Sequence, residues 1–93
     1  MIIIREVFVA KPGQASKLAK MFNSTLEGSP YKVKVMTDMT GPFNTVVMET
    51  ELENVGEIEK RMKAMMADTK MRDKMTGYTD MYIKGKREIY QLV

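Results

Sequence analysis

Residues 2–13 read Ile-Ile-Ile-Arg-Glu-Val-Phe-Val-Ala-Lys-Pro-Gly, a run rich in β-branched and aromatic side chains that ends in a Pro-Gly turn signal. This composition predicts a β-strand over Ile2–Ala10, closed by a turn. In Gln14–Glu27 the apolar residues recur every three or four positions, which is typical of an amphipathic helix. Gly28-Ser29-Pro30 is a helix-ending signal. The chain therefore begins with a strand followed by a helix.

Two strands and a second helix are predicted next. Tyr31–Met39 alternates apolar residues with lysines, which favours an edge strand, because edge lysines discourage stray pairing. Phe43–Leu52 follows a Gly-Pro turn and is expected to form a hairpin with that strand. Asn54 and Glu57 then resemble a capping box. The apolar stripe of the helix that follows consists of Val55, Ile58, Met62, Met65 and Met66.

The last part of the chain reads as a short helix and a long strand. Asp68 is expected to cap a helical piece that runs to Met75, and Gly77 ends it. Tyr78–Val93 is the final predicted strand, with a kink or bulge at Gly85.

The predicted order is β-α-β-β-α-β. Right-handed crossovers then give an antiparallel sheet of spatial order 4-1-3-2 with both helices on one face, plus a short extra helix. This is an α+β fold, the ferredoxin-like plait, and residues 1–93 are expected to form a single domain. The other face of the sheet has no cover within the chain.

Strand alternation assigns side chains to the two faces. We expect the helix side to hold Ile2, Ile4, Phe8, Ala10, Val46, Met48, Leu52, Met81 and Ile83. This assignment leaves Glu6 on the helix side, which is awkward for a carboxylate. We expect the open face to hold Ile3, Arg5, Val7, Val9, Thr45, Val47, Glu49, Tyr78, Asp80, Tyr82 and Lys84.

The open face carries too much apolar and aromatic surface for a monomer to leave in water. A second copy that presents the same face across a twofold axis would bury it. Two such sheets would make an eight-stranded barrel. The end of the last strand, Lys86–Val93, would then reach onto the partner, with Ile89 and Leu92 as apolar anchors.

Composition excludes several kinds of chemistry. The 93 residues are 44% hydrophobic and 29% charged, which is ordinary for a globular protein. The sequence has no Cys and no His, which removes thiol chemistry and the commonest general base and metal ligand. No apolar run of about 18 residues suggests a membrane span. We therefore expect no cofactor, no metal and no membrane partner, and a cytoplasmic location fits this composition. The net charge of +3 is mild, and no nucleic acid partner is expected.

The sequence Phe8-Val-Ala-Lys-Pro12-Gly13, followed by an amphipathic helix, resembles the dimeric α+β barrel superfamily. The long second helix, the short extra helix and the Gly77-Tyr78 entry to the last strand resemble its NIPSNAP-like and antibiotic-biosynthesis-monooxygenase-like branches. The resemblance implies a homodimer that binds a small ligand. Family activities that need a His ligand or a His-Asp pair are in doubt here, because the chain has no His. The resemblance still allows a monooxygenase that uses no cofactor.

One polar cluster on the predicted open face is a candidate site. Arg5, Asp80 and Tyr82 are the candidate catalytic residues, with Arg5 binding an anionic or enolate oxygen and Tyr82 donating a hydrogen bond. The candidate ligand-binding residues are Glu49, Tyr78, Val47 and Val7. The alternative is that the charges form an ion-pair cluster that fixes the register of a dimer, and that the tyrosines pack in the interface.

The eleven methionines permit three interpretations. Soft-metal binding is disfavoured, because neither Cys nor His accompanies them. Flexible filling of the core is the simplest account of the stripe on the second helix. A methionine-lined cavity that adapts to apolar ligands is favoured over a metal site, but less than core filling. Together with the resemblance to the dimeric α+β barrel superfamily, these residues imply a small-ligand-binding barrel protein, with a cofactor-independent monooxygenase or isomerase acting on an apolar or aromatic metabolite as its chemical form. The alternative is a non-enzymatic interaction or stress-related protein with a solidly packed barrel.

Overall fold

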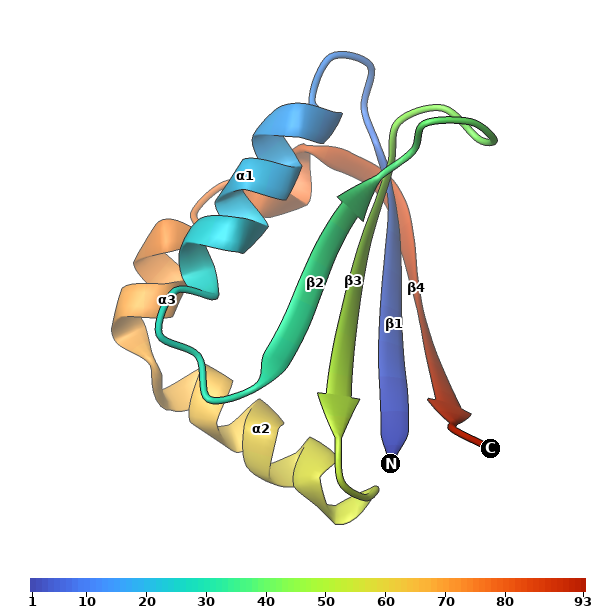
Figure 1. Cartoon of the computed structure of the whole chain (residues 1–93). Coiled ribbons are helices and arrows are strands. Elements are labelled where there is room, and N and C mark those ends of the chain that lie inside the picture. The colour runs from blue at the N-terminus through green and yellow to red at the C-terminus, as the bar shows by residue number, and fades with distance from the viewer.

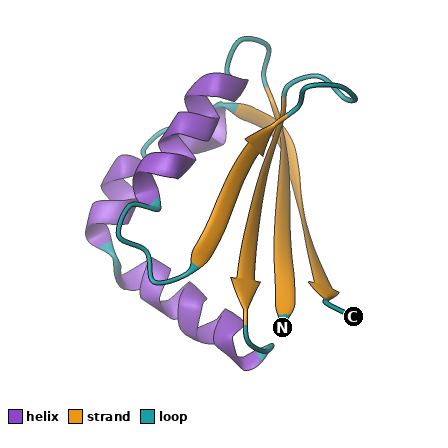
Figure 2. Ribbon diagram, viewed as in Figure 1, coloured by secondary structure: helices purple, strands orange, loops and turns teal.

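The computed structural model describes residues 1–93 as a four-stranded sheet with all helices on one face (Figures 1 and 2). The strand order is β2-β3-β1-β4, and every neighbouring pair is antiparallel. This confirms the predicted ferredoxin-like α+β topology with its short extra helix. No helix is both long and apolar enough to cross a membrane. The elements in chain order are β1 (Ile2–Ala10), α1 (Ala15–Thr25), β2 (Lys32–Thr37), β3 (Thr45–Leu52), α2 (Gly56–Ala67), α3 (Thr69–Lys74), the 3-10 turn η1 (Tyr78–Asp80) and β4 (Tyr82–Gln91).

The core lies between the central strands β1 and β3 and the helices. Helix α1 supplies Leu18 and Phe22, which are buried against Ala10 and Val46. A second buried cluster consists of Ile2, Ile4 and Leu52, and it lies at the other end of the same strands. The predicted alternation of faces is therefore confirmed for β1 and β3.

Glu6 lies on the helix side, as strand parity requires. Its carboxylate is 3.2 Å from a guanidinium nitrogen of Arg87 and 3.8 Å from one of Arg61. Two cations thus compensate the removal of this carboxylate from water, and the awkward parity has a physical explanation.

Strand β4 departs from the prediction. Residues 78–80 form η1 instead of strand, and the register shift falls opposite Val9 and Ala10, where Lys84 and Tyr82 are the successive partners. The bulge is therefore at Ile83 and not at Gly85. Gly85 instead lies against Phe8, whose ring would be 3.2 Å from an added Cβ. The extra residue reverses the alternation beyond the bulge.

The reversal places Tyr82 on the helix side, and η1 places Tyr78 against the same core, so their predicted place on the open face is wrong. The Tyr82 ring lies 5.0 Å from Phe8 and 5.9 Å from Tyr78, between ring centroids. Ile83, which was expected to meet the helices, is 63% exposed. Met81 does pack against the core, as predicted.

Helix α2 also departs from the prediction. Met62, Met65 and Met66 were expected in the core but are all exposed. Ile58 packs against the second core cluster, that of Ile2, Ile4 and Leu52. Arg61 is the buried residue of the helix. Asn54 forms no side-chain cap. The methionine stripe of α2 is therefore not core filling.

The short helix α3 is capped as predicted. The backbone N–H of Met71 donates to Oδ1 of Asp68 at 3.1 Å. Asp68 is also the residue at which α2 ends, so one side chain marks the break between the two helices.

Thr50 of β3 carries the one buried side-chain oxygen that has no hydrogen-bond partner. A Thr50→Val variant keeps the shape of the side chain and removes this unsatisfied hydroxyl. We expect its free energy of unfolding to rise by about 1 kcal/mol, because an unpaired buried polar group costs roughly 1–3 kcal/mol. Urea unfolding measures this, with the exposed Thr40→Val as the matched control. A loss of stability in Thr50→Val would show that the hydroxyl has a partner.

Candidate ligand-binding site

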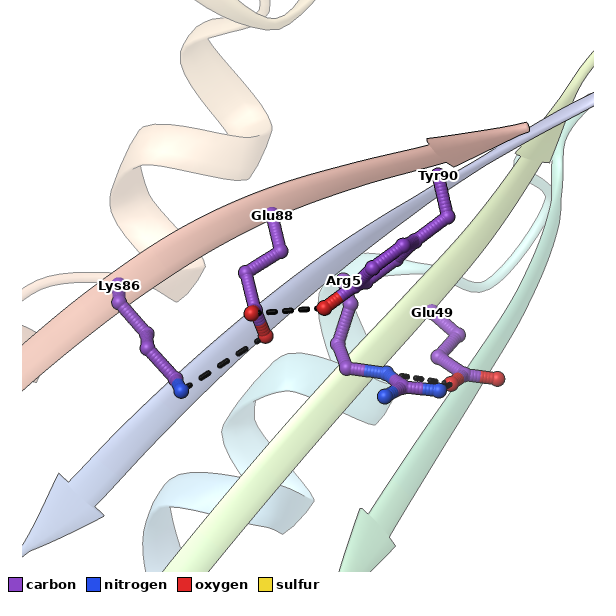
Figure 3. A network of polar contacts seen from close by, with 5 residues as sticks. All are labelled: Arg5, Glu49, Lys86, Glu88 and Tyr90. Atoms are coloured by element: carbon purple, nitrogen blue, oxygen red, sulfur yellow. Dashed lines mark hydrogen bonds and ion pairs between the residues drawn. The ribbon is translucent and has the colours of Figure 1, made fainter.

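The open face carries the predicted ion pair between Arg5 of β1 and Glu49 of β3 (Figure 3). These residues are direct cross-strand partners. Nε of Arg5 donates to Oε2 of Glu49 at 2.8 Å, and a second guanidinium nitrogen lies 2.5 Å from the same oxygen. This hydrogen bond and the charge of Glu49 raise the pKa of Arg5 above its usual value. The pair is fully formed in the single chain.

Strand β4 adds three residues to this cluster. The Arg5 guanidinium lies 5.5 Å from the centre of the Tyr90 ring, which is within the range of a cation–π contact. The Tyr90 hydroxyl donates to Glu88 at 2.7 Å, and Lys86 lies 3.7 Å from Glu88 (Figure 3). The hydrogen bond lowers the pKa of Glu88 and raises the pKa of Tyr90. All three side chains are therefore held in one network.

The structure brings together only some of the predicted site residues. Arg5, Glu49, Val7 and Val47 share the open face, and Val7 is the direct partner of Val47. Asp80 is exposed on η1, before β4 begins, and is not part of the cluster. The catalytic and ligand-binding roles of all these residues stay predictions.

Glu88 and Tyr90 were not predicted beside Arg5, because the wrong part of β4 was expected there. In the structure Arg5 pairs with Glu88, and Ile3 pairs with Tyr90. The bulge between Tyr82 and Lys84 shifts every later residue of β4 relative to a register counted from Tyr78.

The open-face cluster lies in a shallow hollow that only the sheet lines, so its other side is open to solvent. All of its lining residues come from three strands of one sheet and the chain just after β4: Ile3, Arg5, Glu49, Glu51, Tyr90 and Leu92. A small ligand there would keep much of its surface in water, whereas ligand sites normally bury most of it. The hollow would become enclosed only under a second molecule.

A better-enclosed pocket lies on the opposite side of the sheet, between β1, β3 and the three helices. Its volume is about 310 Å³, and nine of its fourteen lining residues are hydrophobic. Ligand sites are typically of this kind, with an apolar wall and few polar groups. The hydrophobic lining residues are Phe8, Phe22, Leu26, Met48, Met65, Met66, Met71, Met75 and Tyr78, and the polar ones are Glu6, Thr25, Arg61, Arg72 and Arg87.

Five methionines thus form much of this wall, contributed by β3, α2, α3 and the residue that ends α3. Methionine side chains are unbranched and adjust to the shape of what they contact. The methionine-lined cavity that the sequence left open is therefore present. Tyr78, a predicted ligand-binding residue, lies in its wall and not on the open face.

The polar groups of the pocket surround Glu6. Arg87 of β4 donates to its carboxylate at 3.2 Å, and Arg61 of α2 approaches it at 3.8 Å. Arg72 of α3 donates to the backbone carbonyl of Met66. No group of three or more acidic side chains is placed to hold a metal ion. The pocket therefore offers an apolar surface with an arginine-rich end.

Solved structures share this fold. One is an uncharacterized NIPSNAP domain protein from Burkholderia xenovorans, with a TM-score of 0.86 at 10% identity over 100% of this chain and 95% of that one. The chain has the fold of NIPSNAP proteins. A NIPSNAP family protein from Agrobacterium tumefaciens strain C58 has a TM-score of 0.84 at 9% identity, over 99% of this chain and 92% of that one.

A putative antibiotic biosynthesis monooxygenase from Chloroflexus aurantiacus also shares the fold, with a TM-score of 0.78 at 14% identity over 99% of this chain and 92% of that one. These are the two branches that the sequence resembles. No protein-family model and no curated protein matches the sequence. At such low identity the likeness establishes the fold alone.

Proposed function

We propose that the protein binds a small, largely apolar molecule in the methionine-lined pocket. The observation that carries this proposal is the pocket itself, with a volume of about 310 Å³ and nine hydrophobic residues among fourteen. Met65 and Met66 support it, because they lie exposed on α2 although they belong to its apolar stripe. A ligand would cover side chains that the fold leaves uncovered.

We also propose that the protein acts as a homodimer through the open face of the sheet. Ile3, Val7, Val9 and Val47 are only half-buried there, in the middle of the face. Tyr90 and Leu92 add exposed apolar surface beside them. A second copy placed across a twofold axis would cover this patch and roof the hollow around Arg5.

A cofactor-independent monooxygenase is the second candidate, favoured by the arginines and Tyr78 in the pocket wall. A phenolic ligand that loses its proton becomes electron-rich, and an arginine of the pocket would stabilise the resulting phenolate. In such a reaction one atom of O₂ enters a ligand CH₂ group as a carbonyl oxygen. The other atom leaves as water with the two hydrogens of that carbon, so the ligand supplies all the electrons.

Binding of the neutral dye Nile red tests the proposed pocket. Met65 and Met62 are both exposed methionines on α2, 36% and 41% respectively, but only Met65 lines the pocket. We expect Met65→Gln to raise the Kd of Nile red about tenfold, since one apolar contact of roughly 1.4 kcal/mol is lost. We expect Met62→Gln to leave it unchanged. Absence of dye binding, or an equal loss in both variants, would contradict the proposal.

A further inference from the structure

Arg61 has more hydrogen-bonding capacity than the structure uses. Its side chain is only 8% exposed, and its nearest acidic atom is a carboxylate oxygen of Glu6 at 3.8 Å. That distance is too long for a hydrogen bond, and the guanidinium donates none elsewhere in the chain. A guanidinium has five N–H donors, and the ion pair with Glu6 balances its charge without accepting any of these donors. The side chain is therefore set up to receive an acceptor.

That acceptor would come from the pocket side. Arg61 lines the methionine-lined pocket and also the adjoining hollow under the α1–β2 connection. Both hollows are open to molecules from outside. The guanidinium thus stands where a bound molecule would meet it.

The charges of the pocket favour an anion. Its lining holds the three arginines Arg61, Arg72 and Arg87 against the single carboxylate of Glu6. Arg87 already hydrogen-bonds Glu6, and no carboxylate lies within ion-pair distance of Arg72. The lining therefore has an excess of two positive charges.

We propose that the pocket takes an amphipathic carboxylate, whose head group contacts Arg61 and whose apolar body lies against the methionines. This rests on the proposed function, because it names the class of ligand for the same pocket. A carboxylate fits a guanidinium in a two-point contact, which supplies both charge and geometry. At roughly 30 Å³ per small group, about 310 Å³ holds about ten heavy atoms, so octanoate fits within the pocket and the larger dye Nile red extends out of its open side. Medium-chain fatty acids and small aromatic acids have this size.

Displacement of Nile red by octanoate and by octanol tests the proposal, because the two compounds differ at the head group. We expect octanoate to displace the dye from the wild-type protein at concentrations at least tenfold lower than octanol. We expect Arg61→Met to raise the apparent Kd of octanoate about tenfold or more and to leave that of octanol unchanged.

Lys63→Met is the matched control, because Lys63 is an exposed cation on the same helix that pairs with Glu59 outside the pocket. It should change neither constant. Since Arg61→Met leaves Glu6 with one cation fewer, the double variant Glu6→Gln/Arg61→Met is measured as well. It removes both charges of the pair, and it should show the same loss of octanoate preference.

The outcomes separate the two proposals. If Nile red does not bind, the proposed function fails. If the dye binds and octanoate is no better than octanol, the pocket stands and the carboxylate proposal is overturned. If octanoate is preferred and the Arg61 variants behave like Lys63→Met, the preference comes from another residue and the role of Arg61 is overturned.

Discussion

A Val7→Lys variant is expected to be a folded monomer at concentrations where the wild-type protein is a dimer. Val7 lies in the middle of β1, a central strand, and its cross-strand partners are Val47 of β3 and Lys86 of β4. In the proposed dimer both copies of Val7 lie in the covered patch. The variant would bury two ammonium groups without carboxylate partners, and each costs several kcal/mol. We expect dimer dissociation to become at least about 100-fold more favourable.

The substitution should leave the fold of the single chain intact. Val7 is only half-buried in the monomer, so the lysine can extend into water. Val55→Lys is the matched control, since it makes the same change at an exposed position at the start of α2, on the other side of the sheet. Native mass spectrometry with circular dichroism measures mass and fold together. A wild-type monomer, or a folded Val7→Lys dimer, would contradict the proposed interface.

Several charged residues of the open face are paired across the strands in a way that suits such an interface, whereas Lys34 and Lys84 on the same face form no ion pair. Lys32 lies 3.6 Å from Glu51 across β2 and β3, and Arg5 is bound to Glu49 across β1 and β3. These pairs form within one chain, so a partner would not have to supply counter-charges for them. The ion-pair cluster then fits the structural alternative, in which Arg5 orders the sheet surface and the ligand lies on the other side.

The fold was predictable from the sequence wherever the face assigned by strand or helix periodicity is the face that is buried in the structure. In residues 2–10 the side chains of the even positions are buried or face the helices, as strand parity predicts. Glu6 was the apparent exception, and the structure shows that a charge can occupy such a position when Arg61 and Arg87 compensate it. A local pattern cannot reveal this, because the two arginines come from distant parts of the chain.

The candidate site was less predictable, because it depends on the extra residue Ile83 in β4 and on what covers the apolar face of α2. The bulge at Ile83 moves Tyr82 to the helix side, and no sequence signal marks it, since Gly85 is the more obvious place for a kink. Helix α2 has an amphipathic stripe, but Met65 faces a pocket and not packed side chains. Periodicity identifies the apolar face of a helix without showing what covers it.

A Leu18→Ala variant is expected to lose about 2–5 kcal/mol of its free energy of unfolding. Leu18 is 0% exposed, and it packs from α1 into the cluster with Ala10, Phe22 and Val46. The loss combines the transfer of the removed groups to water with the cavity left behind. A chain of this length has about 5–14 kcal/mol in total, so this is a large share. Urea unfolding at one fixed protein concentration measures the change.

Lys20→Ala is the control on the same helix, because Lys20 is exposed and alanine is a good helix former. It should change stability by no more than about 0.5 kcal/mol. Leu18 does not line the methionine-lined pocket, so the folded Leu18→Ala protein should bind Nile red with unchanged affinity. If the two variants were equally stable, α1 would not be packed on the sheet through Leu18. If dye affinity fell with stability, the pocket would depend on the core cluster around Leu18. The wall formed by α2 and α3 could then not alone account for binding.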